Sequence, residues 1–485
     1  MLVTIGAAAL RFIGLGTQSM WYDELSTTQV ITGSVSGLLD RIRHSEGTPP
    51  LYFVLATVWS HAFGSGDAAI RSMSALAGTL TVPVAYLVTR AVGGGRRAGL
   101  LVAALVAVNP FLIWYSQEAR AYALAVLLVT VALLFFVKAF QEPTTRNGLL
   151  FAVAGLLAVA THYFALVVIG PELVALVYVH RHEPRFLAAV LAPLAVGGAL
   201  LVPLAALQRS TGLQDWISDW SLAFRLRSLA RFFAIGPGAP EPWLWWLVVG
   251  ATVVAVALAL AFGPAPERSW ARRLALLVVA GVGIPLVAVV LGNDYVLDRN
   301  LIVVLVPLIV VVGMGAAVRR TAWLGLACAA AIAATSIVTA VAVQRDRNLQ
   351  RADWRAVAHA IDHRSGPRLV VFNTSAVLGS ALMRYLPNAR PVSLDAQVPT
   401  RTVDFVGLTK VPASGCDWWS GRSCSIVFLV DQPPPGTGKS LRWVATRRAG
   451  PFRVATYESS APSVNVRDLV APSDRNHAIV MLTER

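Results

Sequence analysis

Long runs of apolar residues recur along the first 343 positions of this chain. They are about 17 to 25 residues long, the length at which an α-helix crosses a bilayer. In the whole chain 56% of residues are hydrophobic and 14% are charged, whereas a soluble domain carries about 25% charged residues. These features predict a polytopic α-helical membrane protein with a more polar region after about Gln344.

We expect eleven membrane helices in this part of the chain. The first should remain in the protein, because no small-residue cleavage site followed by a soluble domain marks it as a signal peptide. The predicted segments are residues 1–16, 68–89, 98–115, 121–140, 148–163, 164–180, 186–207, 243–263, 274–291, 301–318 and 321–343.

The loops between these segments alternate in character. Every second loop is short and basic, and the positive-inside rule places such loops in the cytoplasm. One of them contains Arg268, Arg272 and Arg273. The other loops then lie outside, among them the two long ones, 17–67 and 208–242, together with everything after residue 343. The net charge of +15 is thus explained by topology, and no nucleic-acid partner is expected.

Lysine is rare in this chain. Only Lys138, Lys410 and Lys439 are lysines among 41 basic residues, and alanine and valine are abundant. This pattern is typical of GC-rich coding sequences, so we expect a multi-pass protein of a bacterial plasma membrane.

Both long outer loops mix apolar and aromatic residues with charged ones. In the first, residues 25–31, 38–42 and 51–63 are expected to form short helices at the membrane interface. In the second, aromatic and aliphatic residues alternate with Arg225, Arg227 and Arg231. Two interpretations remain open for it: an amphipathic basic helix on the outer leaflet, or the ordinary aromatic belt of a membrane protein.

Residues 344–485 are expected to form a small extracytoplasmic α/β domain, because helical and strand-like stretches alternate there. The expected helices cover residues 353–361 and 375–385, and the expected strands cover 368–372, 391–394, 425–430, 453–457 and 478–482. Cys416 and Cys424 form either a disulfide outside the cytoplasm or two free thiols. Residues 436–440 look like the end of a phosphate loop, but prolines 433 and 434 stand where its leading glycine is required.

Two groups of acidic residues predicted at the outer face stand out. Asp23 and Glu24 follow the first apolar segment directly. Glu118 lies in a polar island, Ser116–Tyr122, that joins two apolar segments with almost no loop, and such polar residues usually face a cavity.

Both groups allow a chemical and a structural interpretation. A carboxylate here can be a general base for a hydroxyl, and Arg120 or Arg299 can bind phosphate. Adjacent acids at a helix start are otherwise common caps, and Glu118 and Arg120 can simply pair with each other.

Several motifs occur in an order that resembles a known family. They are W-x-D-E after the first segment, H-x-x-x-x-PPLYF from His44, NPFLIWYSQEARAYAL from Asn109, THYFAL from Thr161, RNL from Arg299 and DWRAVA from Asp353. This series resembles the GT-C glycosyltransferases of the family 39/83-like group, relatives of protein O-mannosyltransferases and of the lipid A aminoarabinose transferase. The resemblance covers roughly residues 1–345.

The resemblance implies an inverting glycosyltransferase that moves a sugar, such as mannose or arabinose, from a polyprenyl-phosphate donor. The acceptor would be a cell-envelope glycan, lipid or protein at the outer face of the membrane. Asp23 matches the catalytic base and Glu24 its neighbour, while Glu118 shapes the acceptor or metal site. The implied substrate-binding residues are Arg120, Tyr122, Arg299, His44, Glu46 and Tyr52.

The sequence assigns no cofactor, because it lacks the D-x-D pair that often binds a metal. A divalent cation held by Glu46 and His162 stays an alternative to His162 as a hydrogen-bonded core histidine.

Two other functions remain open. A lipid-linked substrate transporter or flippase would place acids within broken helices near mid-membrane. A non-catalytic scaffold would not need Asp23, Glu24 and Glu118 to converge.

Overall fold

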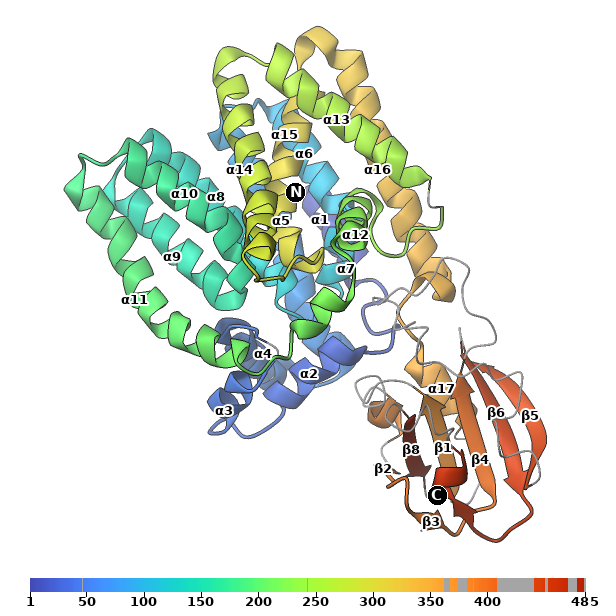
Figure 1. Cartoon of the computed structure of the whole chain (residues 1–485). Helices are drawn as coiled ribbons and strands as arrows, with labels where there is room; N and C mark the ends of the chain where they lie inside the picture. Colours follow the sequence, from blue (N-terminus) through green and yellow to red (C-terminus); the bar gives the residue numbers. More distant parts are fainter. Residues whose placement is uncertain are drawn as a thin grey trace. The chain divides into compact units, whose positions relative to one another are not determined.

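A computed structural model describes most of the chain (Figure 1). The described residues are 1–45, 47–241, 243–361, 367–373, 382–386, 388–407, 440–449, 452–469 and 478–483. They form two compact units, and each is described by itself below. The helical unit comprises Met1–Leu15 and Thr27–Ala342. The second unit comprises Gly16–Ser26 and Val343–Arg485, so a short piece of the predicted first loop clusters with the C-terminal residues.

Helices occupy every predicted membrane segment of the helical unit (Figure 1). They are α1 (Leu2–Phe12), α5 (Asp67–Ala91), α6 (Arg96–Val108) with α7 (Pro110–Ser116), α8 (Tyr122–Gln141), α9 (Thr145–Thr161), η1 (Tyr163–Ala165) with α10 (Leu166–Val179), α11 (Pro184–Arg209), α13 (Leu244–Phe262), α14 (Ala265–Val290), η3 (Arg299–Val304) with α15 (Leu305–Ala316), and η4 (Arg319–Thr321) with α16 (Ala322–Arg345).

The protein is therefore a multi-pass membrane protein. Among the described residues seven helices are long and apolar enough to cross a bilayer, and the bent pair α6–α7 makes up to eight. Three shorter apolar helices, Leu2–Phe12, Thr145–Thr161 and Tyr163–Val179, fall below that length. Eleven crossings therefore stay a prediction.

One predicted helix boundary was wrong. The sequence placed Arg268, Arg272 and Arg273 in a loop before residue 274, but α14 already begins at Ala265, just after Pro264 at its N-cap. Proline fits the first turn of a helix, and the long arginine stems can lie along apolar surface. The guanidinium carbon of Arg273, for example, lies 4.9 Å from the ring centroid of Phe140.

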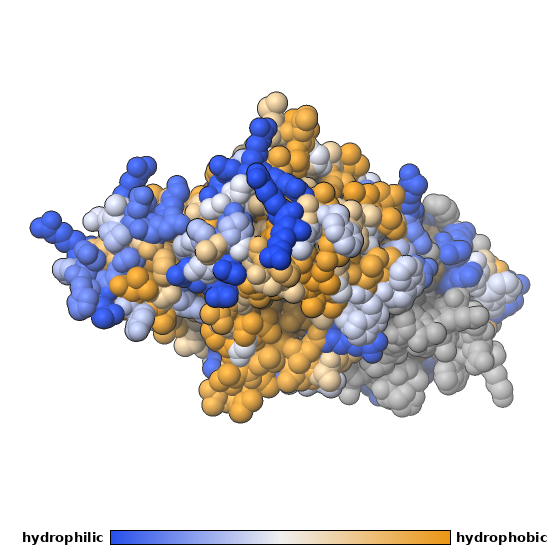
Figure 2. Space-filling view, turned by 90° about the horizontal axis from the view of Figure 1, so that it is seen from above, coloured by the Kyte–Doolittle hydropathy of each residue, from blue (hydrophilic) through white to orange (hydrophobic). Residues whose placement is uncertain are grey.

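Burial separates central helices from those that face lipid. In the most apolar window of Arg299–Ala316, 89% of residues are buried, against 17% in α11 and 22% in α14. Leu200 of α11, for example, is 74% exposed. Hydrophobic residues accordingly form large continuous areas of the face seen in Figure 2. Such surface is stable only in contact with lipid tails.

Glycines let the central helix α15 approach its neighbours closely. A Cβ atom on Gly315 would lie 1.8 Å from the carbonyl oxygen of Ala255 in α13. A Cβ atom on Gly313 would lie 2.3 Å from a methyl carbon of Val102 in α6. Small residues at such contacts are typical of helix packing in membranes.

A buried arginine stabilises the break between α6 and α7, which are bent by 56° at Asn109. Pro110 has no N–H to continue the α6 hydrogen-bond ladder, so carbonyl groups at the end of α6 need other donors. Arg11 of α1 donates to the carbonyl oxygens of Val106 at 3.2 Å and Ala107 at 2.9 Å.

The first long loop contains the expected short helices, α2 (Tyr22–Ile31), α3 (Leu38–Arg43) and α4 (Pro50–Phe63). The second contains η2 (Asp215–Asp219) and α12 (Leu222–Ile235). Phe232 and Phe233 of α12 pack against Phe111 of α7, with ring centroids 6.1 and 5.7 Å away. A face of α12 is therefore covered by protein.

The second unit contains α17 (Trp354–Ile361) and a six-stranded sheet in the order β2-β8-β1-β4-β6-β5. Strands β1 and β4 are parallel and the other neighbours are antiparallel. The strands are β1 (Arg368–Asn373), β2 (Ala389–Pro391), β4 (Thr402–Gly407), β5 (Leu441–Ala449), β6 (Phe452–Ser459) and β8 (Ala478–Thr483). A separate pair joins β3 (Gln397–Val398) to β7 (Val464–Asn465). Two short turns, η5 (Arg347–Leu349) and η8 (Val466–Leu469), complete the unit.

The expected helix at 353–361 and the strands at 368–372, 453–457 and 478–482 are confirmed. The strand expected at 391–394 was misplaced, since β2 ends at Pro391, the one position the two ranges share. The expected strand 425–430, both Cys416 and Cys424, residues 436–439, and most of the expected helix 375–385 lie outside the described residues.

Candidate active site

The polar island between α7 and α8 is buried in the helical unit. Glu118 and Arg120 are both inaccessible to solvent or nearly so. The Ser74 hydroxyl donates to the Arg120 carbonyl oxygen at 3.2 Å. The Gln117 amide Nε2 donates to the carbonyl oxygens of Leu10 and Arg11 at 3.2 and 3.3 Å. The backbone here is therefore fixed from two neighbouring helices, α1 and α5.

His162 lies where α9 ends and η1 begins. Its Nδ1 accepts a hydrogen bond from the backbone N–H of Phe164 at 3.3 Å, and its ring centroid is 5.3 Å from that of Tyr122. The positive charges of Arg120 and Arg299 act on this imidazole. His162 serves here as a helix cap.

Asp298 caps η3 and Arg299 begins it, and the charge of Arg299 acts on His162. One carboxylate oxygen of Asp298 accepts the backbone N–H of Arg299 at 2.5 Å. The other, Oδ2, is buried and has no hydrogen-bond partner within the described chain. Burial raises the pKa of Asp298 to about 7, although the positive charge of Arg299 opposes the shift. The Arg299 guanidinium carbon lies 5.5 Å from the ring centroid of Trp216 in η2.

These residues form one group, which we call the charged cluster: Glu118, Arg120, His162, Asp298 and Arg299. The charges of Glu118, Asp298 and Arg299 all act on Tyr115, and those of Arg120 and Arg299 act on His162.

Aromatic rings connect the members of the charged cluster. The ring of Tyr115 contacts Tyr122 with centroids 4.8 Å apart, and Phe164 joins His162 at 5.8 Å. The cluster thus gathers two cations and two carboxyl groups in a largely apolar surrounding.

The predicted residues Glu118, Arg120, Tyr122, His162 and Arg299 are thus brought together from three stretches of the sequence. Sequence analysis did not single out Asp298. Its one available signal was an acid directly before the Arg299-Asn300-Leu301 motif, and several other acids have similar settings.

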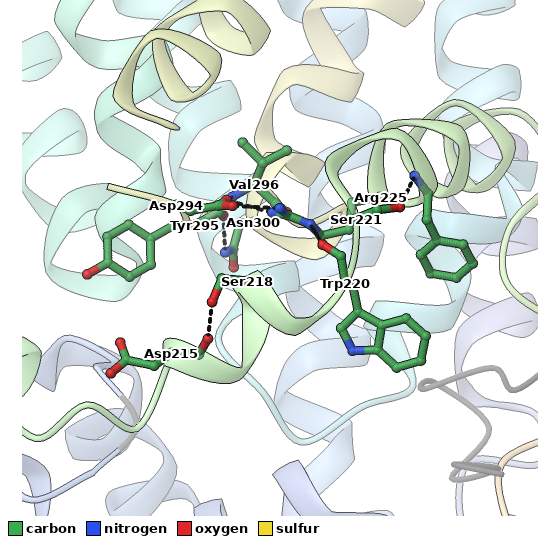
Figure 3. Close-up of polar contacts among 10 residues, drawn as sticks. Asp215, Ser218, Trp220, Ser221, Arg225, Asp294, Tyr295, Val296 and Asn300 are labelled. Carbon is green, nitrogen blue, oxygen red and sulfur yellow. Dashed lines mark hydrogen bonds and ion pairs between the residues drawn. The ribbon is translucent and has the colours of Figure 1, made fainter. Parts of the chain in front are cut away.

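Arg225 of α12 has a different environment (Figure 3). Its guanidinium donates to both carboxylate oxygens of Asp294 at 2.6 Å, to the carbonyl oxygen of Val296 at 2.8 Å and to that of Trp220 at 2.9 Å. The pair lowers the pKa of Asp294. One of the two interpretations placed Arg225 on the polar face of a surface helix, but Arg225 turns inward and fixes α12 to the segment before η3.

The first loop is held in the helical unit by Gln208, at the end of α11. Its amide donates to the carbonyl oxygens of Ile42 at 2.8 Å and Thr48 at 3.1 Å, and it accepts the hydroxyl of Tyr163 at 2.9 Å. Tyr163 is the neighbour of His162, so this contact ties the stretch before α4 to the start of η1.

The other predicted first-loop residues have different settings. Tyr52 is buried in α4. His44 is 70% exposed and lies 3.6 Å from the Asp40 carboxylate. Glu46 lies outside the described residues.

Asp23 and Glu24 belong to the second unit and are both buried. They stand in the first turn of α2, and Glu24 Oε2 accepts the backbone N–H of Trp21 at 3.3 Å. This is half of a capping box, in which an acid at the third helical position reaches back to the cap residue. Glu24 thus has the structural role that was one of the two interpretations of the acid pair. That Asp23 and Glu24 lie near the charged cluster remains a prediction.

A complete metal site is not formed by the described residues, among which no three histidine, cysteine, aspartate or glutamate side chains converge. His162 also uses Nδ1 as a hydrogen-bond acceptor. Glu46 lies outside the described residues, so the divalent site suggested for Glu46 and His162 stays a prediction.

Comparison with known proteins identifies relatives of this chain. Residues 47–207 match the family described as dolichyl-phosphate-mannose-protein mannosyltransferase. ArnT from Cupriavidus metallidurans, in a crystal structure bound to undecaprenyl phosphate, shares 13% identity at a TM-score of 0.53 and covers 97% of this chain and 98% of its own. The search of curated proteins found no match.

Two further solved structures are more distant. The oligosaccharyltransferase of Archaeoglobus fulgidus in the apo form has 12% identity and a TM-score of 0.44, covering 75% of this chain. This chain spans 57% of that protein's length. The S. cerevisiae Pmt1-Pmt2 complex bound to the sugar donor has 19% identity and a TM-score of 0.35, covering 41% of this chain and 32% of that one.

The family match lies in the part of the chain that contributes Glu118, Arg120 and His162 to the charged cluster. The fold agrees with that of ArnT along nearly the whole of both chains. Together these findings show that the chain has the GT-C fold and that residues 47–207 are similar to a mannosyltransferase family.

Proposed function

We propose that this protein transfers a sugar from a polyprenyl-phosphate donor to a cell-envelope acceptor at the outer face of a bacterial plasma membrane. The observation that carries this proposal is the charged cluster, in which Arg120 and Arg299 lie near Glu118 and Asp298. Burying such charges is costly unless a partner or a reaction uses them.

The two arginines suit the phosphate of the donor. A guanidinium presents a planar fork of N–H donors that matches phosphate oxygens. As the sugar leaves, negative charge grows on the phosphate, and fixed cations in a water-poor site stabilise that charge strongly. The charges of Arg120 and Arg299 both act on His162, which supports the assignment because it puts the two guanidinium groups near one another.

Asp23 is the residue we assign as general base. Glu24 accepts the backbone N–H of Trp21 and so caps α2, while the motif resemblance matches its neighbour Asp23 with the base. In the proposed step Asp23 takes the acceptor hydroxyl proton while the acceptor oxygen forms a bond to the anomeric carbon. The bond from that carbon to the phosphate oxygen breaks, and its electron pair leaves with the polyprenyl phosphate. One displacement of this kind inverts the anomeric centre.

The similarity to ArnT supports the donor class, since that protein was crystallised with undecaprenyl phosphate. The family match over residues 47–207 makes mannose the first sugar to test, and arabinose the second. In this proposal residues 343–485 face the outside, as the loop charges predict. Glu118 shapes the acceptor site, and Tyr122, His44, Glu46 and Tyr52 contact substrate.

Activity can be tested with the full-length protein in lipid nanodiscs. The donors are radiolabelled polyprenyl-phosphate mannose and arabinose, and bacterial envelope membranes supply the acceptor. We expect loss of label from the lipid and its gain in the acceptor. Asp23→Asn should lower the rate by at least ~1,000-fold, because it removes the base without changing side-chain size.

Asp468→Asn, an exposed acid in the same unit, is the matched control and should keep wild-type activity. Near wild-type transfer by Asp23→Asn would exclude this base. Movement of the intact donor across the bilayer, without cleavage, would instead favour a flippase.

A further inference from the structure

Residues Gly16–Ser26, which precede and include the acid pair, cluster with the C-terminal residues and not with the helical unit. More than 300 positions separate these stretches in the sequence. The contacts between them involve backbone and side-chain groups on both sides, so they hold a specific conformation of the segment.

The first contact is a shared cap on α17. Helix N-termini have backbone N–H groups without partners inside the helix. Here Asp353 accepts the N–H of Ala356 at 3.1 Å, and the hydroxyl of Ser19 accepts the N–H of Arg355 at 3.0 Å. The Ser19 hydroxyl in turn donates to Asp353 at 3.3 Å. A first-loop serine thus completes a cap of a helix in the second unit.

Arg355 and Tyr385 supply the second set of contacts. The Arg355 guanidinium donates to the carbonyl oxygens of Gly16 at 2.6 Å and Thr17 at 3.3 Å. The Tyr385 hydroxyl accepts the backbone N–H of Met20 at 2.7 Å. Since the Arg355 guanidinium also lies 5.3 Å from the ring centroid of Tyr385, the two side chains support each other.

The helix that bears Arg355 is itself fixed to the sheet. Trp354 packs on Phe452 of β6 with ring centroids 4.9 Å apart. Arg447 of β5 donates to the carbonyl oxygen of Ala360 at the other end of α17 at 3.0 Å. The sheet therefore holds α17 at both ends, and α17 holds residues 16–20.

Only two residues separate Met20 from Asp23. Within this stretch the Glu24 carboxylate accepts the backbone N–H of Trp21. The chain from Met20, which Tyr385 binds, to the start of α2 therefore has little conformational freedom.

We infer that the second unit positions the acid at residue 23 for catalysis, with Arg355 and Tyr385 as the positioning residues. This inference rests on the function proposed above. It gives the C-terminal residues a role in the transfer step, since a base displaced by about 1 Å can slow a reaction by ~100-fold.

Hydrogen–deuterium exchange on the full-length protein tests the anchoring without any need for activity. Arg355→Ala and Tyr385→Phe should each increase exchange in peptides covering residues 16–26, while peptides of β4 and β6 stay protected. Tyr385→Phe removes a single oxygen atom, so it remains informative if Arg355→Ala folds poorly. Arg442→Ala, which breaks an exposed ion pair with Glu458 on the sheet, is the matched control and should leave residues 16–26 unchanged.

Steady-state kinetics on the same variants tests the positioning. We expect Arg355→Ala to lower kcat by ~10- to 100-fold with KM for the lipid donor within about twofold of wild type, because a misplaced base affects only the transition state. Unchanged exchange in both variants would disprove the anchoring, and faster exchange with unchanged kcat would disprove the positioning. Full activity of Asp23→Asn would disprove the proposed base alone, while the exchange data would still report on the anchoring.

Discussion

Two aspartates in the segment before η3 lie four residues apart and have opposite environments. Asp294 is 22% exposed, binds both arms of Arg225, and its pKa is lowered. Asp298 is almost fully buried, with its pKa raised to about 7 and one oxygen lacking a hydrogen-bond partner among the described residues. The first arrangement satisfies its charges and fixes structure. The second keeps an acid in a costly state, which is typical of functional sites.

Arg299, which directly follows Asp298, should be more important for catalysis than Arg225. We expect Arg299→Gln to lower kcat/KM for the polyprenyl-phosphate sugar by ~100- to 1,000-fold, because it removes a fixed cation from the leaving phosphate. Its thermal unfolding midpoint in detergent should stay close to wild type. Arg227→Gln on the exposed side of α12 is the matched control, and equal losses of activity in both variants would contradict the comparison.

The ion pair between Arg225 and Asp294 should be more important for stability than for catalysis. Arg225→Ala leaves Asp294 and the carbonyl oxygen of Val296 without their donor, which should cost about 3 kcal/mol of unfolding free energy. Denaturant unfolding followed by tryptophan fluorescence measures this loss. Below the unfolding transition the remaining folded protein should keep most of its kcat. If stability is unchanged and kcat falls, the roles assigned to Arg225 and Arg299 are reversed.

The two aspartates should also differ in how they make the stability of the protein depend on pH. Asp298 keeps its proton in the folded state up to about pH 7, whereas the unfolded carboxyl loses it near pH 4. The folded state therefore binds more protons between these values, so its stability falls as pH rises from about 4 to about 7.

Asp298→Asn removes this titration. Its unfolding midpoint relative to wild type should increase from pH 5 to pH 8 by at least about 3 °C. Asp294→Asn should be less stable than wild type by a constant amount from pH 5 to pH 8, because Asp294, whose pKa is lowered, keeps its stabilising charge throughout this range. A constant difference between Asp298→Asn and wild type across this range would show that Asp298 is ionised throughout.

Sequence analysis predicted the helix positions well because length and hydropathy are local properties. It placed the start of α14 too late, since Arg268, Arg272 and Arg273 were assigned to a loop although helix and arginine are compatible at a membrane surface. Strand β5 was not predicted because nearly all of its side chains are exposed or half-buried and three of them are arginines.

The site was harder to predict than the fold. Motif order selected Glu118, Arg120 and Arg299, but the special state of Asp298 depends on burial by residues distant in sequence. The hydrogen bonds of Arg355 to Gly16 and Thr17 leave no local pattern at all. Such contacts between distant stretches can be seen only in three dimensions.

The hydrogen bonds of Arg11 also constrain the order in which the helices pack during synthesis. Helix α1 has only 11 residues and carries a charge that is fully buried in the finished protein. The partners that satisfy this guanidinium, Val106 and Ala107, are made about a hundred residues later. An apolar helix with an unsatisfied arginine is a poor candidate for stable insertion on its own. We therefore expect α1 to reach its final position only after α6 and α7 have emerged, later than its place in the sequence suggests.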